Sequence, residues 1–219
     1  MFDKIAILAE KGYRPDTILD IGACHGNWTK SMQHIFPDAK YYLFEAIDYS
    51  ELNQFKNQPN VRVCNALLSD EIKQVDWYQM KNTGDSMFRE KTRHFTNCAS
   101  IKRETIDLNT YLWKNNLLQE SSNILIKIDC QGAEIPILKG SSLILGKTDF
   151  VLLEIPLFGQ YNEGVPNFLE HIEFMNSIGF VVYDIVDNHY INKFNMQVDV
   201  LFINKNHRFN AMVNELLLV

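Results

Sequence analysis

Short apolar runs recur along the chain, and they constrain its fold more than any other feature of the sequence. Three of these runs, Thr17–Ile21, Ile124–Ile128 and Phe150–Ile155, are apolar at most positions instead of alternating apolar with polar residues. Strands of this kind are covered on both faces, which is typical of parallel sheets flanked by helices. Segments with helical spacing of apolar residues separate the runs. This alternation predicts an α/β fold in which a mostly parallel sheet has helices on both sides.

The expected elements form one domain, residues 1–219, because no linker, repeat or low-complexity segment interrupts the chain. The last two strands are separated by a loop of about eleven residues, which predicts a closing hairpin. Asp48 and Glu51 are spaced as a capping box for a short helix through Phe55. We expect longer helices over residues 2–11, 27–36, 107–118, 134–145 and 166–178, and strands over residues 17–21, 40–44, 61–68, 75–80, 123–128, 150–155, 180–186 and 198–203.

Charge and cysteine content narrow the classes of function. The formal net charge is −6 and no block of Lys or Arg residues occurs, which argues against a nucleic-acid-binding protein. No apolar run is long enough to span a bilayer, and the N-terminus lacks the pattern of a signal peptide. Cys24, Cys64, Cys98 and Cys130 lie far apart, so we expect free thiols in a reducing compartment. The sequence therefore predicts a cytoplasmic protein without a membrane span.

The loop after the first strand, "LDIGACHGNW", carries the first functional signal. Gly22 and Gly26 allow the backbone to turn tightly and to approach a ligand, and Asp20 is placed either to hold the loop or to contact that ligand. The second strand ends at Glu45, nineteen residues after Gly26. An acid at this place can accept hydrogen bonds from both hydroxyls of a ribose. The pattern indicates a nucleoside cofactor, whereas the glycines alone are also compatible with a plain tight turn.

The glycine spacing distinguishes between cofactors. A dinucleotide loop has the form G-x-G-x-x-G, so that a pyrophosphate can lie at a helix N-terminus. This chain has D-x-G-x-x-x-G instead, and no Lys or Arg stands near a phosphate position. A cofactor with a ribose but no phosphate fits better, and S-adenosylmethionine is one. An NAD-type oxidoreductase remains the alternative enzyme class.

This loop resembles the first motif of the class I methyltransferases. The segments "TILDIGACHGNW", "YLFEA", "NALLSD", "GDSMF", "ETIDLNTYL", "LIKIDCQGAEIPILKG", "VLLEI" and "QVDVLFI" are similar, in this order, to the FkbM-type methyltransferase family. The resemblance implies a Rossmann-like seven-stranded sheet whose last strand inserts antiparallel. It also implies S-adenosylmethionine-dependent O-methylation, commonly of sugars or polyketide-type natural products.

The same resemblance implies roles for individual residues. This chain departs from the family at three of them, because the family usually has Glu at Gln131, Asn at Cys24 and Pro at Ala46. At Gln131 a hydrogen-bonding role survives the change, but a role that needs a charge does not. By position, Asp20, Gly22, Ala23, Cys24, Gly26, Asn27 and Trp28 would form the cofactor loop, Glu45 and Ala46 would adjoin the ribose, Ala66, Leu67, Ser69 and Asp70 would surround the adenine, Ser86 would lie near the amino-acid end of the cofactor, and Asp129, Gln131 and Glu134 would line the floor beneath the methyl group.

Three carboxylates are candidate general bases for the acceptor hydroxyl: Asp129, Glu134 and Glu154. Each follows or ends a strand at the expected binding edge of the sheet. The alternatives are structural, a turn cap for Asp129 and a favourable first-turn acid for Glu134. His25 and His189 are expected in loops as polar surface residues. Asp129 and Glu154 can also supply oxygen ligands to Mg²⁺, although two carboxylates do not favour a metal site.

The loop "IPLFGQYNEGVPNF" follows the strand that ends near Glu154 and is expected to cover the acceptor. Phe158 and Tyr161 offer flat surfaces of the kind that stack on sugar rings. The sequence therefore predicts an O-methyltransferase that acts on a sugar hydroxyl of a small or carrier-linked carbohydrate. Because of Gln131, a protein that binds the cofactor but lacks activity stays as a second alternative.

Overall fold

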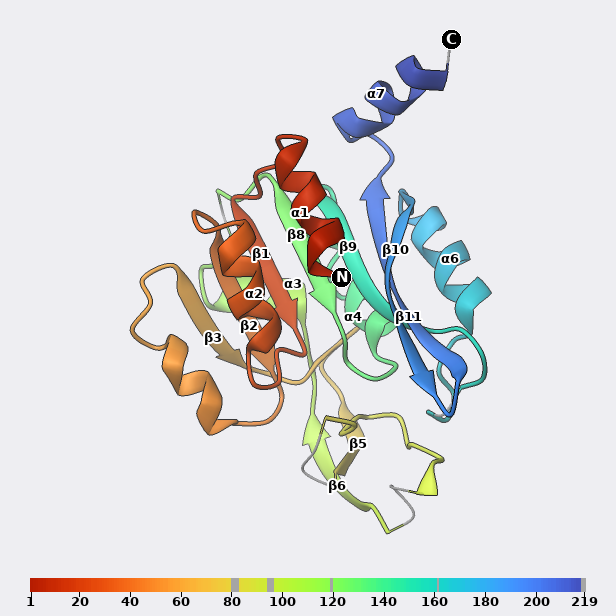
Figure 1. Cartoon of the computed structure of the whole chain (residues 1–219). Coiled ribbons are helices and arrows are strands. Elements are labelled where there is room, and N and C mark those ends of the chain that lie inside the picture. Colours follow the sequence, from red (N-terminus) through yellow and green to blue (C-terminus); the bar gives the residue numbers. More distant parts are fainter. Residues whose placement is uncertain (80–82, 94–96, 119, 161, 218–219) are drawn as a thin grey trace.

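A computed structural model describes residues 1–79, 83–93, 97–118, 120–160 and 162–217. Its main sheet has seven strands in the order β10-β11-β9-β8-β1-β2-β3, and the predicted α/β class is confirmed (Figure 1). Strands β1, β2, β3, β8 and β9 are parallel, whereas β11 lies antiparallel between β9 and β10. The strands of this sheet are β1 (Thr17–Ile21), β2 (Lys40–Glu45), β3 (Val61–Asn65), β8 (Ile124–Ile128), β9 (Thr148–Pro156), β10 (Phe180–Ile191) and β11 (Phe194–Asn204).

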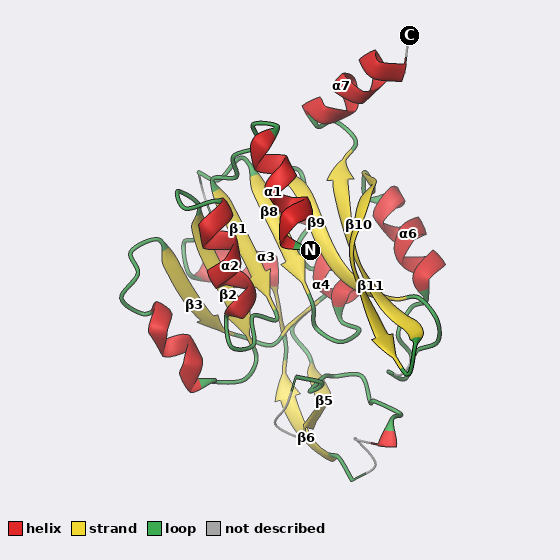
Figure 2. Cartoon of the chain, viewed as in Figure 1, coloured by secondary structure: helices red, strands yellow, loops and turns green. Residues whose placement is uncertain are grey.

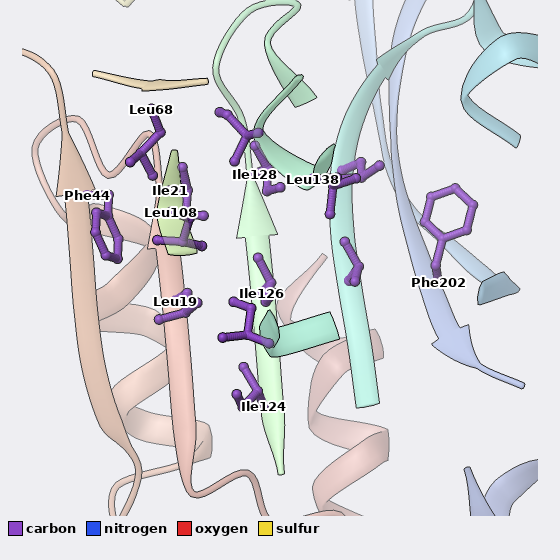
Figure 3. Close-up of a cluster of buried hydrophobic side chains, with 14 of the residues drawn as sticks. Leu19, Ile21, Phe44, Leu68, Leu108, Ile124, Ile126, Ile128, Leu138 and Phe202 are labelled. Carbon is purple, nitrogen blue, oxygen red and sulfur yellow. The ribbon is translucent and has the colours of Figure 1, made fainter. Parts of the chain in front are cut away.

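Helices cover both faces of the sheet, as Figure 2 shows. Two separate hydrophobic cores result, one on each face. One core includes Leu19, Ile126 and Phe202 of the sheet and is shown in Figure 3; α3, α4, α5 and α6 pack on it. The other core lies beneath α1, α2, η1 and α7. The helices are α1 (Phe2–Glu10), α2 (Asn27–Ile35), the 3₁₀ helix η1 (Ser50–Phe55), α3 (Leu108–Lys114), α4 (Glu134–Lys139), α5 (Ser142–Leu145), α6 (Phe168–Ser177) and α7 (Arg208–Leu217).

The strand order reverses beside β1. The chain passes from β1 outward to β2 and β3, and it returns on the other side of β1 as β8 and β9. Ligands of such sheets bind at this switch point, outside the carboxyl ends of the strands. A small hairpin, β5 (Gln74–Gln79) and β6 (Ala99–Glu104), lies beyond those carboxyl ends (Figure 1). A further pair, β4 (Leu68–Ser69) and β7 (Ile106–Asp107), connects this hairpin to the body.

The C-terminal hairpin differs from the prediction. Its connection is the two-residue turn Asn192–Lys193, and both residues have positive φ, 49° and 69°. Such a turn matches the twist of paired strands, so β10 and β11 continue almost to the tip. The expected eleven-residue loop was therefore wrong, and His189 lies in β10.

Other differences from the prediction are local and concern single helices and strands. The predicted helix 134–145 is divided into α4 and α5 at Gly140, where an added Cβ would come within 2.4 Å of the Ser69 carbonyl oxygen. The short helix at Phe55 starts after Tyr49 and has no side-chain cap, so the Asp48 capping box was wrong. Strand β6 and helix α7 were not predicted, and Met80 of the predicted strand 75–80 lies outside the described residues.

Two further observations concern the cysteines and the length of the helices. All four cysteines are free thiols. Across the described part of the chain, no helix combines the length and the apolar character that crossing a membrane requires.

Candidate functional site

A cavity of about 290 Å³ opens at the carboxyl ends of β1, β2, β8 and β9. It lies at the switch point of the sheet, and β5 with the loop that follows it forms its outer wall. Its lining combines carboxylates at several strand ends with apolar side chains. The lining residues are Ile21, Gly22, Cys24, Phe44, Glu45, Ala46, Ile47, Tyr49, Ala66, Leu67, Leu68, Trp77, Thr83, Asp85, Met87, Asp129, Cys130, Gln131, Ala133 and Glu154.

The two glycines of the first loop are needed for close packing. Gly22 has a φ of 76°, and a Cβ on it would lie 2.0 Å from the carbonyl oxygen of Asp129. Gly26 also has a φ of 76°, and a Cβ on it would lie 2.2 Å from the ring of Phe55. Both positions therefore exclude any side chain. The Gly22 turn holds the ends of β1 and β8 together, and it presents its backbone to the cavity.

Asp20 fastens this loop from behind the cavity wall. Its side chain is fully buried, and its Oδ2 accepts a hydrogen bond from the Thr29 hydroxyl at 2.6 Å. The Lys127 ammonium lies 3.2 Å from Asp20 Oδ1 and donates to the Gly22 carbonyl oxygen at 2.8 Å. Burial alone would lower the pKa of Lys127, but the negative charges of Asp20 and Asp129 raise it overall. Asp20 is thus in the position to hold the loop, the first of its two predicted roles.

Glu45 reaches the cavity and also supports its wall. One carboxylate oxygen accepts from the Cys24 backbone N–H at 2.7 Å, and the other accepts from the Ile47 backbone N–H at 2.9 Å. Burial raises the pKa of Glu45, and these backbone donors oppose that increase. A carboxylate oxygen can accept more than one hydrogen bond, so both oxygens retain capacity toward a ligand with two hydroxyls.

Fourteen of the residues predicted around the cofactor divide equally, since seven line the cavity and seven lie behind or beside it; of the other three, Gln131 lines the cavity and Asp70 and Glu134 do not. Ser86 is an example of the second group, since its buried hydroxyl donates to the Gln131 carbonyl oxygen at 2.9 Å and accepts from the Phe88 N–H. Its neighbour Asp85 lines the cavity instead. Lining the cavity are Gly22, Cys24, Glu45, Ala46, Ala66, Leu67 and Asp129; behind or beside it are Asp20, Ala23, Gly26, Asn27, Trp28, Ser69 and Ser86.

The outer wall contains residues that the sequence prediction missed. Trp77, Thr83, Asp85 and Met87 come from the segment around β5. Trp77 is 5% exposed, so it has the burial of a core residue although it belongs to a small hairpin. The available signal was the buried-type pattern "VDWY" followed closely by the acidic "GDSM" turn.

Three carboxylates lie in a row across the sheet edge. Asp129 follows β8, Glu154 lies near the end of β9, and Asp199 on β11 stands directly opposite Glu154 in the strand register. The Gln131 amide bridges the first two, at 3.3 Å from Asp129 Oδ1 and 2.9 Å from Glu154 Oε2. Burial raises the pKa of Glu154 well above its usual value, and the charges of Asp129 and Asp199 raise it further. We call Asp129, Glu154 and Asp199 the acid row.

Glu134 is separate from this row. One of its oxygens accepts from the backbone N–H groups of Cys130 and Gly132, at 3.0 and 3.2 Å. It begins α4, lies beside a second hollow of about 10 Å³, and is 1% exposed. Burial raises the pKa of Glu134 to about 7. The position corresponds to the structural alternative for this residue, an acid that organises the start of a helix.

The remaining described candidates do not line the cavity. The His25 ring meets the Tyr49 ring edge to face, and Phe158 is exposed and stacks on Phe194 at 5.9 Å. Tyr161 lies outside the described residues. His189 contacts Asp199 at 2.7 Å.

The same region contains three side chains of the kinds that bind metal ions. Ligand atoms of Glu154, His189 and Asp199 lie within 4.8 Å of one another. Glu154 Oε2 already accepts from the amides of Gln131 and Gln197, and His189 already contacts Asp199. These internal partners account for the cluster, and we assign it no metal.

Comparisons with known proteins place the chain among methyltransferases. A domain described as "Methyltransferase FkbM domain" matches residues 20–182. Among solved structures, the chain is similar to methyltransferase FkbM from Methylobacillus flagellatus, with a TM-score of 0.52, 11% identity and coverage of 85% of this chain and 43% of the other. The chain thus spans less than half the length of that relative. No curated protein matches the sequence.

Two further structures show the same fold. The fibrillarin pre-rRNA processing protein from Methanococcus jannaschii has a TM-score of 0.52 and 14% identity, with coverage of 89% of this chain and 68% of the other. The magnesium protoporphyrin IX methyltransferase from Synechocystis, solved with S-adenosylmethionine bound, has a TM-score of 0.51 and 8% identity, with coverage of 93% and 77%. At such identities the similarity describes the fold alone. The domain match runs from Asp20, behind the cavity, into β10, and the chain therefore belongs to the FkbM methyltransferase family.

Proposed function

We propose that this protein is an S-adenosylmethionine-dependent O-methyltransferase whose acceptor is a sugar hydroxyl of a small or carrier-linked carbohydrate. The observation that carries the proposal is a cavity lined by Glu45 at the end of β2, Asp129 just after β8 and Glu154 near the end of β9. One end of that cavity suits a nucleoside, and the other holds groups that can accept a proton. The four free thiols support a reducing compartment, so we include the cytoplasm in the proposal.

The residues around the cavity fit the cofactor. Gly22 lines the cavity with backbone atoms alone, and Glu45 has acceptor capacity for two ribose hydroxyls. Phe44, Leu67 and Trp77 supply apolar surface for an adenine ring. When bound there, S-adenosylmethionine supplies a methyl group on a positively charged sulfur. The carboxylates of the lining complement that charge.

The chain's own residues have two tasks in methyl transfer. The first is to hold the acceptor oxygen in line with the methyl carbon, and such orientation can lower a barrier by about 7–11 kcal/mol. The second is to remove the hydroxyl proton, which contributes roughly 10²–10⁴-fold. Asp129 and Glu154 both line the cavity and are the candidates for this second task. Oε1 of Glu134 accepts from two backbone donors, whereas Oε2 is buried without a hydrogen-bond partner among the described residues, and we propose a structural role for this side chain.

The groups near the acid row favour a carbohydrate acceptor. Gln131 and Gln197 place carboxamides beside the carboxylate of Glu154, and planar polar groups of this kind can bind adjacent sugar hydroxyls. Phe158 and Phe194 form an exposed aromatic pair with ring planes 17° apart. A flat apolar surface of this kind suits a pyranose ring.

The test has two arms. Thermal-shift measurements should show stabilisation by S-adenosylhomocysteine and none by NAD. Incubation with methyl-deuterated S-adenosylmethionine and a panel of nucleotide sugars, glycosides and lipid-linked sugars should then add one labelled methyl group to a member of the panel, detected by mass spectrometry. Stabilisation by NAD alone would favour an oxidoreductase. Binding of S-adenosylhomocysteine without any labelled product would count against the enzyme and favour a cofactor-binding protein.

A further inference from the structure

His189 stands at the outer end of the acid row and contacts two of its members. Its Nε2 atom lies 2.7 Å from Asp199 Oδ2 and 3.8 Å from Glu154 Oε1. The two carboxylates come from different strands, β11 and β9, and both are nearly buried, with side chains 7% and 10% exposed. The His189 side chain is 42% exposed. The imidazole therefore lies between a buried carboxylate pair and solvent.

The orientation of Glu154 directs one of its oxygens toward His189. Oε2 accepts hydrogen bonds from the Gln131 and Gln197 amides, at 2.9 and 3.0 Å. These two donors fix the carboxylate plane, and Oε1 is the atom nearest His189 Nε2. Glu154 also lines the cavity. It is thus the one member of the acid row that adjoins both the cavity and the imidazole.

The charges around Glu154 oppose its ionisation. Asp129, Asp199 and Glu134 all face it, and with burial they raise its pKa well above the usual value. His189 faces it from β10 as a group that can carry positive charge. An opposite charge within about 4–6 Å favours the ionised form of a carboxyl group.

The groups around His189 in turn favour its protonated, positively charged form. The hydrogen bond to Asp199 raises the pKa of His189, and partial burial opposes this. The negative charges of Asp187 and Asp129 add to the increase. The imidazole is therefore held in its protonated form to higher pH than an isolated histidine.

We propose that His189, oriented by Asp199, is a positioning residue that keeps the Glu154 carboxylate ready to accept the proton of the methyl acceptor. The inference rests on the proposed function. In the transfer step the hydroxyl proton passes to Glu154 while the acceptor oxygen bonds to the methyl carbon and the carbon–sulfur bond of the sulfonium breaks. After product release Glu154 returns its proton to solvent.

Two substitutions with opposite effects on the pH profile test this role. Kinetics of methyl transfer at saturating S-adenosylmethionine should give a bell-shaped dependence of kcat/KM on pH. His189→Gln removes the positive charge beside Glu154, so the ascending limb should move to higher pH and kcat should fall roughly 10–100-fold. Asp199→Asn removes a negative charge that raises the pKa of both Glu154 and His189, so the whole profile should move to lower pH.

Controls separate this role from a structural one. Asp184→Asn changes another carboxylate of β10, but that side chain is 38% exposed and pairs with Lys4 outside the acid row, so activity should stay within about twofold. The KM for S-adenosylmethionine and the affinity for S-adenosylhomocysteine should be unchanged in all three variants. Thermal unfolding should show that each variant is folded at the assay temperature.

The outcomes are distinguishable. A wild-type protein that transfers no methyl group overturns the proposed function together with this inference. Active wild-type enzyme with His189→Gln at full rate, or with both limbs unmoved in His189→Gln and Asp199→Asn, overturns the inference alone. Loss of activity without any movement of the limbs would assign His189 a purely structural role and would also overturn it. Opposite movements of the profile in the two variants would support it.

Discussion

Lys127 donates a hydrogen bond to the carbonyl oxygen of Gly22 at 2.8 Å, and this bond joins β8 to the turn that follows β1. The same ammonium lies 3.2 Å from the buried carboxylate of Asp20 and 3.5 Å from Asp129. One cation therefore neutralises the buried carboxylate behind the loop that follows β1 and also contacts the first member of the acid row. The stability of the fold and the shape of the cavity depend on the same side chain.

Lys127→Met should destabilise the protein by about 3–5 kcal/mol, because it leaves the Asp20 carboxylate buried without a counter-charge. Urea denaturation at pH 7 measures this loss, and S-adenosylhomocysteine affinity should fall with it. Lys102→Met removes an exposed lysine paired with Asp76 and serves as the matched control, with little expected change. Equal stability of the two variants would show that the buried Lys127–Asp20 pair stabilises the fold no more than the exposed Lys102–Asp76 pair does.

Gly22→Ala should abolish cofactor binding, since a Cβ would lie 2.0 Å from the Asp129 carbonyl oxygen and force β1 and β8 apart. Gly179→Ala is the matched control, because Gly179 also has a positive φ, 92°, but an added Cβ would meet nothing within 4 Å. Backbone strain alone should cost the control about 1–2 kcal/mol. The excess loss in Gly22→Ala, measured by denaturation and by calorimetry with S-adenosylhomocysteine, isolates the steric contact. Similar losses in the two variants would contradict it.

Strands with a clear apolar pattern were predictable from the sequence, whereas strands held mainly by backbone pairing were not. Strands β1 and β8 are buried along their whole length, so their sequences are apolar and easy to identify. Strand β6 has mainly exposed side chains and is held by its pairing to β5, which leaves no apolar pattern. The outer wall of the cavity comes from β5 and the loop that follows it, and its place over the strand ends depends on such pairing, so the wall was missed.

The functional site was likewise predictable where apolar parallel strands place its residues, and not where the pairing of the C-terminal hairpin places them. Asp129 follows β8 and Glu154 lies near the end of the neighbouring parallel strand β9, and the carboxyl ends of such strands meet at one edge. The proximity of Asp199 and His189 depends on the position of β11 between β9 and β10 and on a two-residue turn with two positive φ values. The residues at that turn, Asn192 and Lys193, give only half of the usual Asn-Gly signal, so the sequence did not predict the strand around His189.

Gln131→Glu should make stability depend on pH, because it places a third carboxylate between Asp129 and Glu154. In the folded protein the pKa of the new acid would be raised above its unfolded value. The destabilisation should therefore be small below about pH 4 and should grow as pH rises toward neutrality. Denaturation of the variant and the wild type across this range measures it, with Gln131→Ala as the uncharged control. A difference that is constant with pH would mean that the new acid avoids the two carboxylates.

Glu134→Gln should increase stability at neutral pH. Burial raises the pKa of Glu134 to about 7 from an ordinary 4.5, so the folded state binds its proton more tightly than the unfolded state does. The associated stabilisation is complete below about pH 4.5 and disappears as pH rises to about 7, a range worth up to about 3 kcal/mol. Glutamine keeps an oxygen for the Cys130 and Gly132 N–H groups but has no proton to lose. The variant should therefore lack this pH dependence, and its advantage over the wild type should grow between pH 4.5 and 7 in urea denaturation series.

If both proteins lose stability equally over that range, Glu134 is ionised in the folded state at low pH and the backbone donors outweigh burial. Because Glu134 is placed outside the acid row, methyl transfer should persist in the variant, and its loss would instead return Glu134 to the candidates for the general base.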